Sequence, residues 1–230
     1  MDWNKEIITK IDFENIENRE QKERIANKIV DKVKDGDIIG FGSGSTAYLA
    51  ICAIAEKIQK EQITITAIPT SYEVELLCHY FHIPTASLLE KKPDWSFDGA
   101  DEVNKEKWMI KGRGGAMFRE KLNIANSKIT YILVDDTKLV DKLGLNFKIP
   151  VECYMDTLNY VKEELIMLGA KNISIRKAVS KDGPVITERG NIILDVQFNE
   201  ISEHLEKDIK SITGVIESGL FIGYNVEIIK

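Results

Sequence analysis

Residues 38–60 contain the pattern that most limits what this chain can fold into. Residues 38–41 (IIGF) form a short apolar run typical of a buried strand, and a glycine-rich stretch follows directly. From residue 47 the sequence AYLAICAIAEKIQK has helical spacing, with Leu49, Ala53 and Ile54 on one face. A strand, a glycine loop and a helix in this order begin a βαβ unit, so a parallel sheet is expected.

The alternation of strand and helix continues through the first 140 residues. Apolar residues at helical spacing predict helices over residues 21–33 and after residue 71, and residues 63–68 (ITITAI) predict a strand between them. The second of these helices is expected to turn Val74, Leu77, Cys78 and Phe81 inward. The fold class that follows is α/β, with a mostly parallel, Rossmann-like sheet flanked by helices.

The pattern changes after Pro150. The expected order there is strand 151–154, helix 157–168, strand 173–178, strand 192–198, helix 201–212 and strand 215–221. This β-α-β-β-α-β order is typical of a small ferredoxin-like α+β domain, with Gly190-Asn191 as a turn in its central connection. We therefore predict residues 1–145 plus 215–230 as the larger α/β domain and residues 146–214 as the smaller one.

Charge and hydropathy exclude several classes of function. The chain has 31 Lys and Arg against 37 Asp and Glu, a net charge of −6, which disfavours nucleic acid as a partner. The longest apolar run, residues 47–55, is about half the length of a membrane span, and the charged N-terminus has no export signal. No membrane partner and a cytoplasmic location are expected.

The cysteines and histidines give no pattern for a metal or a disulfide. Three cysteines, Cys52, Cys78 and Cys153, are widely spaced, and we expect free thiols, buried or half-buried, in a reducing compartment. The three histidines are His79, His82 and His204. They lack partners at the spacing of a metal site and are expected to be structural or surface residues.

The first stretch with chemical potential is residues 40–46 (GFGSGST). Its glycines allow a ligand to approach the main chain, and its hydroxyls and the following helix start offer hydrogen-bond donors to a phosphate group. It fits neither the Walker loop, because no lysine follows the last glycine, nor the GxGxxG pattern. A plain tight turn is the alternative.

Two further stretches carry charged residues beside glycines. Residues 97–102 (FDGADE) contain three acidic residues that follow apolar residues of a possible strand. The acids lie either at the carboxyl end of a strand, where ligands of open α/β sheets bind, or in a solvated turn. Residues 111–121 (KGRGGAMFREK) place Lys111 before a glycine loop and Glu120 in a following helix. A carboxylate that takes a proton and an ammonium that stabilises an oxyanion suit proton transfer beside a carbonyl; for Glu120 a surface ion pair is the alternative.

These residues, in this order, resemble the type A family of ribose-5-phosphate isomerases. The resemblance covers nearly the whole chain, through the blocks GFGSGST, IPTSYE, FDGADEVN, KGRGGAMFREK, VDDTKLVDKLG, IPVEC, GNIILD and GVIESGLF. It implies an aldose–ketose isomerase of the pentose phosphate pathway that interconverts D-ribose 5-phosphate and D-ribulose 5-phosphate through an enediolate, without cofactor or metal. A homodimer or homotetramer is expected.

The resemblance also implies the site residues. Glu120 shuttles the proton between C2 and C1, Lys111 stabilises the oxyanion, Asp98 assists ring opening and Asp101 orients the sugar hydroxyls. The phosphate is expected at Ser43, Gly44, Ser45, Thr46 and Lys138, with Lys22 as a further contact. The remaining residues expected to line the substrate are Gly99, Ala100, Gly112, Arg113 and Gly114.

This chain departs from the family pattern at three positions. Arg113 stands where the family usually has glycine, so it either binds phosphate or points to solvent. Arg189 replaces an asparagine in a turn, and Ser43 replaces a threonine while keeping the hydroxyl.

Two other classes of function remain to be distinguished. One is a sugar-phosphate sensing domain of a transcriptional regulator, although about 20 residues before the first helix are too few for a helix-turn-helix domain. The other is a lactonase, amino-sugar deaminase or acyl-CoA transferase related to the same family. A deaminase would be expected to carry a catalytic histidine, and neither His79 nor His82 lies in a glycine-rich block.

Overall fold

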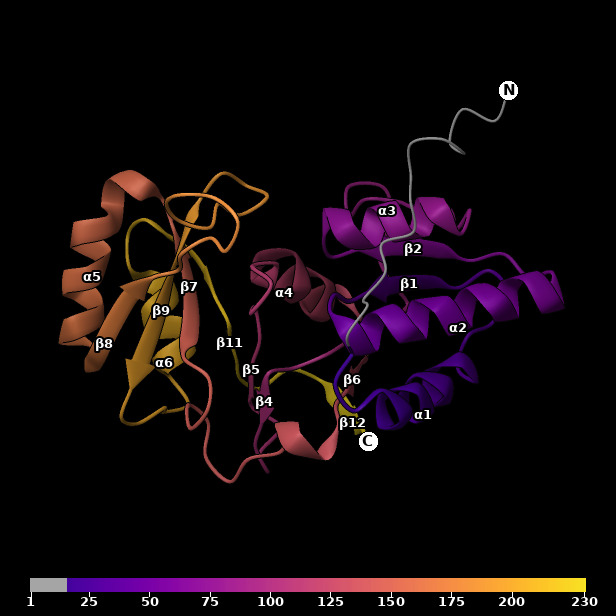
Figure 1. The fold of residues 1–230 in the computed structure, drawn as a ribbon, viewed down its shortest axis with the longest axis horizontal. Helices are drawn as coiled ribbons and strands as arrows, with labels where there is room; N and C mark the ends of the chain where they lie inside the picture. Colours follow the sequence, from indigo (N-terminus) through magenta and orange to yellow (C-terminus); the bar gives the residue numbers. More distant parts are fainter. Residues whose placement is uncertain (1–15) are drawn as a thin grey trace. The chain divides into compact units, whose positions relative to one another are not determined.

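The computed structural model describes residues 16–230 (Figure 1), so most of the N-terminal stretch judged above for an export signal lies outside the described residues. The contacts divide the chain into two compact units. Unit 1 contains the described residues up to Gly99, together with Arg119–Thr137 and Asn225–Lys230, and unit 2 contains Ala100–Phe118 and Lys138–Tyr224.

Unit 1 is built on a five-stranded sheet in the order β12-β6-β3-β1-β2, and every neighbouring pair in it is parallel. Its strands are β1 (Ile38–Phe41), β2 (Thr66–Pro69), β3 (Trp95–Asp98), β6 (Thr130–Leu133) and β12 (Val226–Ile229). The predicted parallel sheet is confirmed. Strand β1 has the predicted bounds, whereas β2 begins three residues later than expected.

Helices cover this sheet through apolar faces. They are α1 (Arg19–Val30), α2 (Ser45–Glu61), α3 (Tyr72–Tyr80) and, from Arg119 onward, α4 (Met117–Asn126). Helices α1 and α2 pack on each other, and α3 packs on β2 (Figure 1). The core includes Ile25 and Ile29 from α1, Ile51 and Ile54 from α2, and Phe41 from β1, all of them buried. The strand and the helix of the strand–glycine loop–helix pattern therefore both contribute to the core of unit 1.

Unit 2 contains a four-stranded antiparallel sheet in the order β10-β7-β9-β8. Its elements are β7 (Ile149–Cys153), α5 (Leu158–Met167), β8 (Ala170–Ile175), β9 (Ile192–Phe198), α6 (Leu205–Ser211) and β10 (Val215–Ser218). Counted within this sheet, the strand order is 4-1-3-2, with a helix after the first and third strands. The predicted ferredoxin-like domain is confirmed.

A three-stranded sheet in unit 2 was not predicted. It pairs β4 (Glu102–Val103), β5 (Met109–Ile110) and β11 (Leu220–Phe221) in the order β11-β5-β4. The single strand predicted over residues 215–221 is in fact two: β10 pairs with β7, and β11 pairs with β5. The division falls at Gly219, whose N–H donates to the Pro150 carbonyl (2.7 Å) and whose carbonyl accepts from the Lys111 N–H (2.8 Å).

Gly219 has no room for a side chain. A Cβ atom there would overlap the main-chain oxygen of Lys111 and would lie 2.6 Å from Cδ of Pro150. We expect Gly219→Ala to lower the free energy of unfolding by about 1–3 kcal/mol, the usual cost of overpacking, measured by urea denaturation. The neighbouring Ser218→Ala is the control, since it removes a fully buried hydroxyl with no hydrogen-bond partner among the described residues. Equal stability of the two variants would contradict this prediction.

The unit boundaries differ from the predicted domain boundaries. Residues 100–118, 138–145 and 215–224 were expected in the larger domain and group with unit 2. The reason is strand pairing, because β10 belongs to the antiparallel sheet and β4 and β5 pair with β11.

The cysteines are free thiols, as predicted. Cys78 and Cys153 are buried and Cys52 is half-buried. Burial, with a smaller effect from neighbouring glutamates, raises the pKa of Cys78 to about 12 and that of Cys153 to about 11. Both thiols are therefore protonated at neutral pH and are poor nucleophiles. Across residues 16–230 no helix combines the length and the apolar character that a membrane span requires.

Candidate active site

Three neighbouring parallel strands of unit 1 end at one edge of the sheet, and polar residues follow each of them. Ser43 follows β1, Thr70 and Ser71 follow β2, and Asp98 is the last residue of β3. Ligands of open α/β sheets bind at the carboxyl ends of the strands. This edge is therefore the candidate substrate-binding edge of unit 1.

Hydrogen bonds join these residues to one another. The Asp98 carboxylate, 2% exposed, accepts from the main-chain N–H groups of Ser43 (3.2 Å) and Gly99 (2.8 Å). The Ser43 hydroxyl lies 2.8 Å from the Thr70 hydroxyl and 3.0 Å from that of Ser71. A Cβ atom at Gly42 would overlap the Asp98 side chain, so only glycine allows this close approach. The glycine loop and the first acid of the FDGADE stretch thus form one structure.

The loop leads into the first turn of α2. The sequence predicts that the loop and this first turn bind a phosphate group. Gly44, the N-cap of α2, has a φ of 94° that favours glycine and gives no side-chain cap, and the helix begins at Ser45 and Thr46. The buried Lys22 side chain of α1 reaches this turn: its ammonium donates to the Ser45 hydroxyl (3.2 Å) and lies 3.8 Å from Asp135. A lysine beside the amino end of a helix favours a bound anion.

Glu120 lies in the first turn of α4 and is 5% exposed. Asn123, one turn later on the same face, donates to the Ile68 carbonyl of β2 (2.8 Å). In the other direction, Arg119 lies 4.0 Å from Glu75 and 5.5 Å from the Tyr72 ring, both in the first turn of α3 after β2 ends. The amino end of α4 therefore lies at the carboxyl edge of the sheet, and Glu120 is a buried carboxylate rather than a surface charge.

In unit 2, strand pairing brings Asp101 and Lys111 together. Strands β4 and β5 pair Glu102 with Ile110 and Val103 with Met109, so the same register places Asp101 opposite Lys111 just beyond the strands. The Asp101 N–H donates to the Ile110 carbonyl (2.8 Å). Lys111 is 2% exposed and its ammonium lies 5.7 Å from the centre of the Phe221 ring of β11. A carboxylate and a buried lysine thus share one end of this small sheet.

The glycine loop after Lys111 returns to Asp101. The Arg113 main-chain N–H donates to the Asp101 carboxylate (3.2 Å), and the Arg113 guanidinium, largely exposed, lies 4.0 Å from the same carboxylate. The side chain that departs from the family pattern is therefore paired with a candidate site residue. Gly112 is buried, Gly114 is exposed and Ala100, next to Asp101, is half-buried.

Lys138, predicted to bind phosphate, ends the short 3-10 helix Asp136–Lys138 and is half-buried. Its ammonium lies 5.1 Å from the centre of the Phe147 ring.

Glu102, the third acid of the FDGADE stretch, has a structural role. It is fully buried, and its two carboxylate oxygens accept from the main-chain N–H groups of Gly144 (2.6 Å), Asn146 (2.6 Å) and Phe147 (3.1 Å). Three such bonds fix the 144–147 loop and leave this carboxylate unsuited to proton transfer. The acids of one short stretch therefore have different roles.

Sequence reasoning missed Thr70, Ser71 and Gly219 as residues that shape the site. The two hydroxyls directly follow a predicted strand, a signal that a systematic search of strand ends would have found. Gly219 gave no local signal, because its contacts are with Lys111 and Pro150, which are distant in the sequence.

Comparison with known proteins decides the family. The family model described as "Ribose 5-phosphate isomerase A (phosphoriboisomerase A)" matches residues 66–230. The chain belongs to the ribose 5-phosphate isomerase A family. The sequence resemblance is thereby confirmed, and the parallel sheet and the ferredoxin-like unit are the fold of a ribose 5-phosphate isomerase A.

Relatives and solved structures agree with this family. Ribose-5-phosphate isomerase A of Methanocaldococcus jannaschii is 42% identical over 206 residues, 89% of this chain and 91% of that protein. The enzyme of Prochlorococcus marinus strain NATL2A is 41% identical over 215 residues, 91% of each chain. The solved M. jannaschii structure has a TM-score of 0.89, with 40% identity over 93% of this chain and 96% of that one. A ribose-5-phosphate isomerase solved in complex with phospho-erythronic acid has a TM-score of 0.88, with 36% identity over 93% of this chain and 95% of that one.

Proposed function

We propose that this chain interconverts D-ribose 5-phosphate and D-ribulose 5-phosphate as an aldose–ketose isomerase of the pentose phosphate pathway. The observation that carries the proposal is the set of buried ionisable groups at the ends of strands and helices, within a chain of this family. Asp98, Lys111 and Glu120 are each at most 5% exposed. Burying charged groups is costly, so a buried ionisable group that ends a strand or begins a helix at a ligand-binding edge is a candidate for chemistry.

The central step is a proton transfer between neighbouring carbons. Glu120 removes the proton from C2 of the open-chain aldose, and the electrons of the C–H bond form the C1–C2 double bond of an enediolate. Lys111 stabilises the negative oxygen that develops at C1. The C2 hydroxyl then gives its proton to this oxygen and becomes the carbonyl, the C1–C2 double bond opens, and Glu120 returns the first proton to C1. Protons and electrons balance within the substrate, so the step needs neither an oxidant nor a reductant.

The other residues prepare the substrate for this step. Asp98 assists opening of the sugar ring and Asp101 orients the hydroxyls. Ser43, Gly44, Ser45 and Thr46, together with Lys22 and Lys138, hold the phosphate group. An anchored phosphate fixes C1 and C2 against the base, and such positioning is a large part of catalysis.

An assay on three substrates tests the proposed function. Purified protein, with a chelator present, is given ribose 5-phosphate, glucosamine 6-phosphate or a phosphogluconolactone, and each product is followed by a coupled reaction. We expect turnover of ribose 5-phosphate alone, inhibited competitively by phospho-erythronic acid, the ligand in the similar solved structure. Turnover of another substrate, or binding of ribose 5-phosphate without turnover, would contradict the proposal in favour of a related enzyme or a sensor.

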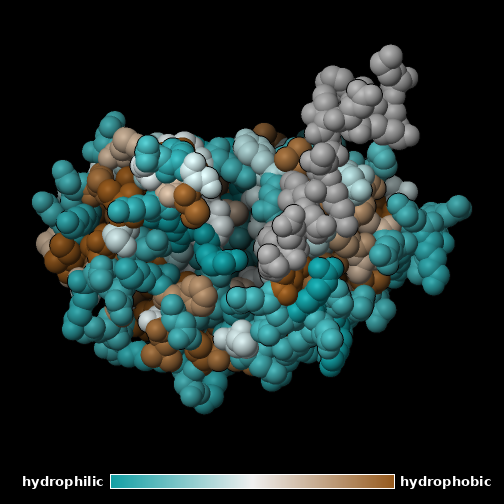
Figure 2. Space-filling model, in the orientation of Figure 1, coloured by the Kyte–Doolittle hydropathy of each residue, from teal (hydrophilic) through white to brown (hydrophobic). Residues whose placement is uncertain are grey.

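We also propose a cytoplasmic location and assembly into a homodimer or homotetramer. Apolar surface supports the assembly: Figure 2 shows brown patches over the region where Figure 1 places α5 and β8. The exposed large apolar side chains of these two elements are Tyr160, Ile166, Met167 and Ile175. Extended apolar surface of this kind marks protein interfaces. Sedimentation velocity would reveal the assembly, and a monomer at micromolar concentration would contradict it.

A further inference from the structure

Arg176 of unit 2 has a main chain fixed on both sides. It directly follows β8, its N–H donates to the Ile193 carbonyl of β9 (2.8 Å), and its carbonyl accepts from the Val185 N–H (2.8 Å). Strand register places Ser174 opposite Asp195, so Arg176, two residues further on, lies diagonal to Asp195 on the same face of the sheet. The direction in which this side chain leaves the sheet is therefore set by β8 and β9.

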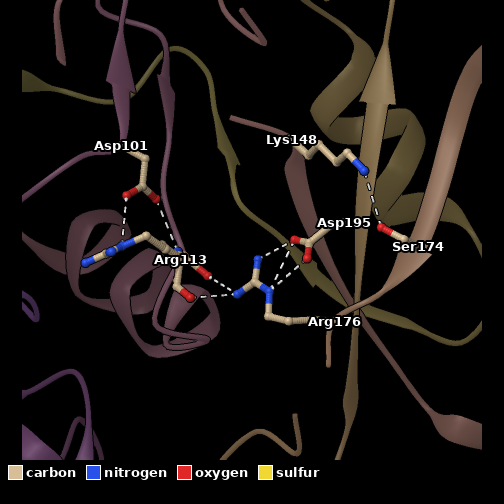
Figure 3. Close-up of polar contacts among 7 residues, drawn as sticks. Asp101, Arg113, Lys148, Ser174, Arg176 and Asp195 are labelled. Carbon is tan, nitrogen blue, oxygen red and sulfur yellow. Dashed lines mark hydrogen bonds and ion pairs between the residues drawn. The ribbon is translucent and has the colours of Figure 1, made fainter. Parts of the chain in front are cut away.

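The Arg176 guanidinium uses all three of its nitrogens. Nε donates to both Asp195 carboxylate oxygens (3.2 and 3.0 Å), and Nη2 donates to one of them as well. Nη1 donates to two consecutive main-chain carbonyls of the glycine loop, those of Gly112 (2.9 Å) and Arg113 (2.7 Å). Figure 3 shows the guanidinium between Asp195 and the loop, with Asp101 on the far side of Arg113. The Arg176 side chain is 16% exposed and that of Asp195 is 23% exposed, so water screens the pair little.

The two carbonyl contacts set the direction of the loop N–H groups. In a trans peptide the C=O and the following N–H point in opposite directions. Because the Gly112 carbonyl points at Arg176, the Arg113 N–H points away from it, and it donates to Asp101 (3.2 Å). The Arg113 carbonyl in the same way directs the Gly114 N–H away from Arg176. Two successive donors therefore face the side of the loop on which Asp101 lies.

We propose that Arg176, held by Asp195, is a positioning residue for the isomerase reaction, acting through the Gly112–Arg113 main chain on Asp101. This inference rests on the proposed function, because Asp101 matters to turnover only if the sugar is the substrate. Arg176 touches the loop carbonyls and Asp195 and has no role as an acid or a base. A lysine can replace it only in part, since one ammonium cannot reproduce a fork that binds a carboxylate and two carbonyls in one plane.

Substitution of Arg176 should therefore lower kcat more than binding. We expect Arg176→Ala to reduce kcat by about 10- to 100-fold, the range that a small misplacement of a catalytic group produces, with KM for ribose 5-phosphate changed far less. Arg176→Lys is expected to recover only part of kcat, and it serves as the second variant if Arg176→Ala does not fold. Lys148→Met is the matched control, because Lys148 donates to Ser174 (3.3 Å), opposite Asp195 on the neighbouring strand (Figure 3), and it should keep wild-type kcat.

A double-mutant cycle separates this role from a general loss of stability. If Arg176 acts through Asp101, Arg176→Ala will lower kcat by a much smaller factor in an Asp101→Asn background than in the wild type. The proposal would be overturned if Arg176→Ala lowered kcat by the same factor in both backgrounds. It would also be overturned if Arg176→Ala had the same kcat as Lys148→Met.

Hydrogen exchange gives a readout that does not depend on the substrate. The Arg113 amide donates to Asp101, and the Gly115 amide donates to the Gly112 carbonyl (3.0 Å) that Arg176 also holds. We expect these two amides to exchange faster in Arg176→Ala, while amides of β9 stay protected. Unchanged exchange at the Arg113 and Gly115 amides would overturn the positioning role even if the enzyme is active. A wild-type protein without isomerase activity would instead overturn the proposed function, and the exchange result would still decide whether Arg176 holds the loop.

Discussion

Glu120→Gln is expected to lower kcat for ribose 5-phosphate isomerisation by about 10²–10⁴-fold, the range that general acid–base catalysis supplies. Glutamine has almost the same shape as glutamate but cannot accept the proton from C2. Glu120 is buried in the first turn of α4, so the substitution changes the chemistry of the group while keeping its place. Steady-state kinetics gives kcat, and a calorimetric titration of ribose 5-phosphate gives the binding affinity, which should stay nearly the same.

Glu75→Gln is the matched control for this experiment. Glu75 lies on α3, 4.0 Å from Arg119, the residue before Glu120, and its side chain is 37% exposed. The same change of charge close to the site should leave kcat near the wild-type value. A Glu120→Gln enzyme with near-normal turnover would show that another group moves the proton.

Lys111→Ala is expected to reduce kcat by about 10²–10³-fold, the usual cost of losing one oxyanion donor. The ammonium is the charge that stabilises the enediolate oxygen, and Lys111 is buried at the end of β5 opposite Asp101. Because its removal also leaves a hole in a packed site, Lys111→Met, which keeps most of the volume, should show a similar loss of kcat. Circular dichroism and thermal denaturation would test whether both variants fold.

Lys105→Ala is the control for the lysine variants. Lys105 lies in the connection between β4 and β5, is 79% exposed and pairs with Asp141 (2.8 Å). Exposed ion pairs contribute little to stability, so this variant should behave as the wild type. If Lys111→Met retained full kcat, the oxyanion would have to be stabilised without this ammonium.

Local patterns in the sequence predicted the elements whose partners are close in the chain. The apolar residues 38–41 and the helical spacing after them predicted a buried strand and a helix that packs its apolar face on the sheet. Both elements form. The alternation at residues 192–198 predicted β9 with its observed bounds. Asp98 at the end of an apolar stretch was predicted as a group at the mouth of the sheet, and it ends β3 there.

Features that depend on distant partners could not be predicted in this way. Residues 215–221 look like one strand, and only the contacts of Gly219 with Pro150 and Lys111 divide them between two sheets. Strands β4 and β5 have two residues each, too few to show a period, and β5 is completed by β11. Likewise the Arg176 contacts with Gly112 and Arg113 join residues more than 60 positions apart. Pairing across such separations leaves no local trace in composition or spacing.

The most direct test of proton transfer by Glu120 is the isomerisation of ribose 5-phosphate in deuterated water. A base that removes the C2 proton and holds it beside an enediolate exposes that proton to exchange, so ribulose 5-phosphate should carry deuterium at C1 and recovered ribose 5-phosphate at C2. Proton NMR and mass spectrometry measure both, with a chelator present. We expect wild-type incorporation of deuterium well above uncatalysed exchange and its loss in Glu120→Gln. Turnover without deuterium above the uncatalysed level, or equal incorporation in the variant, would contradict it.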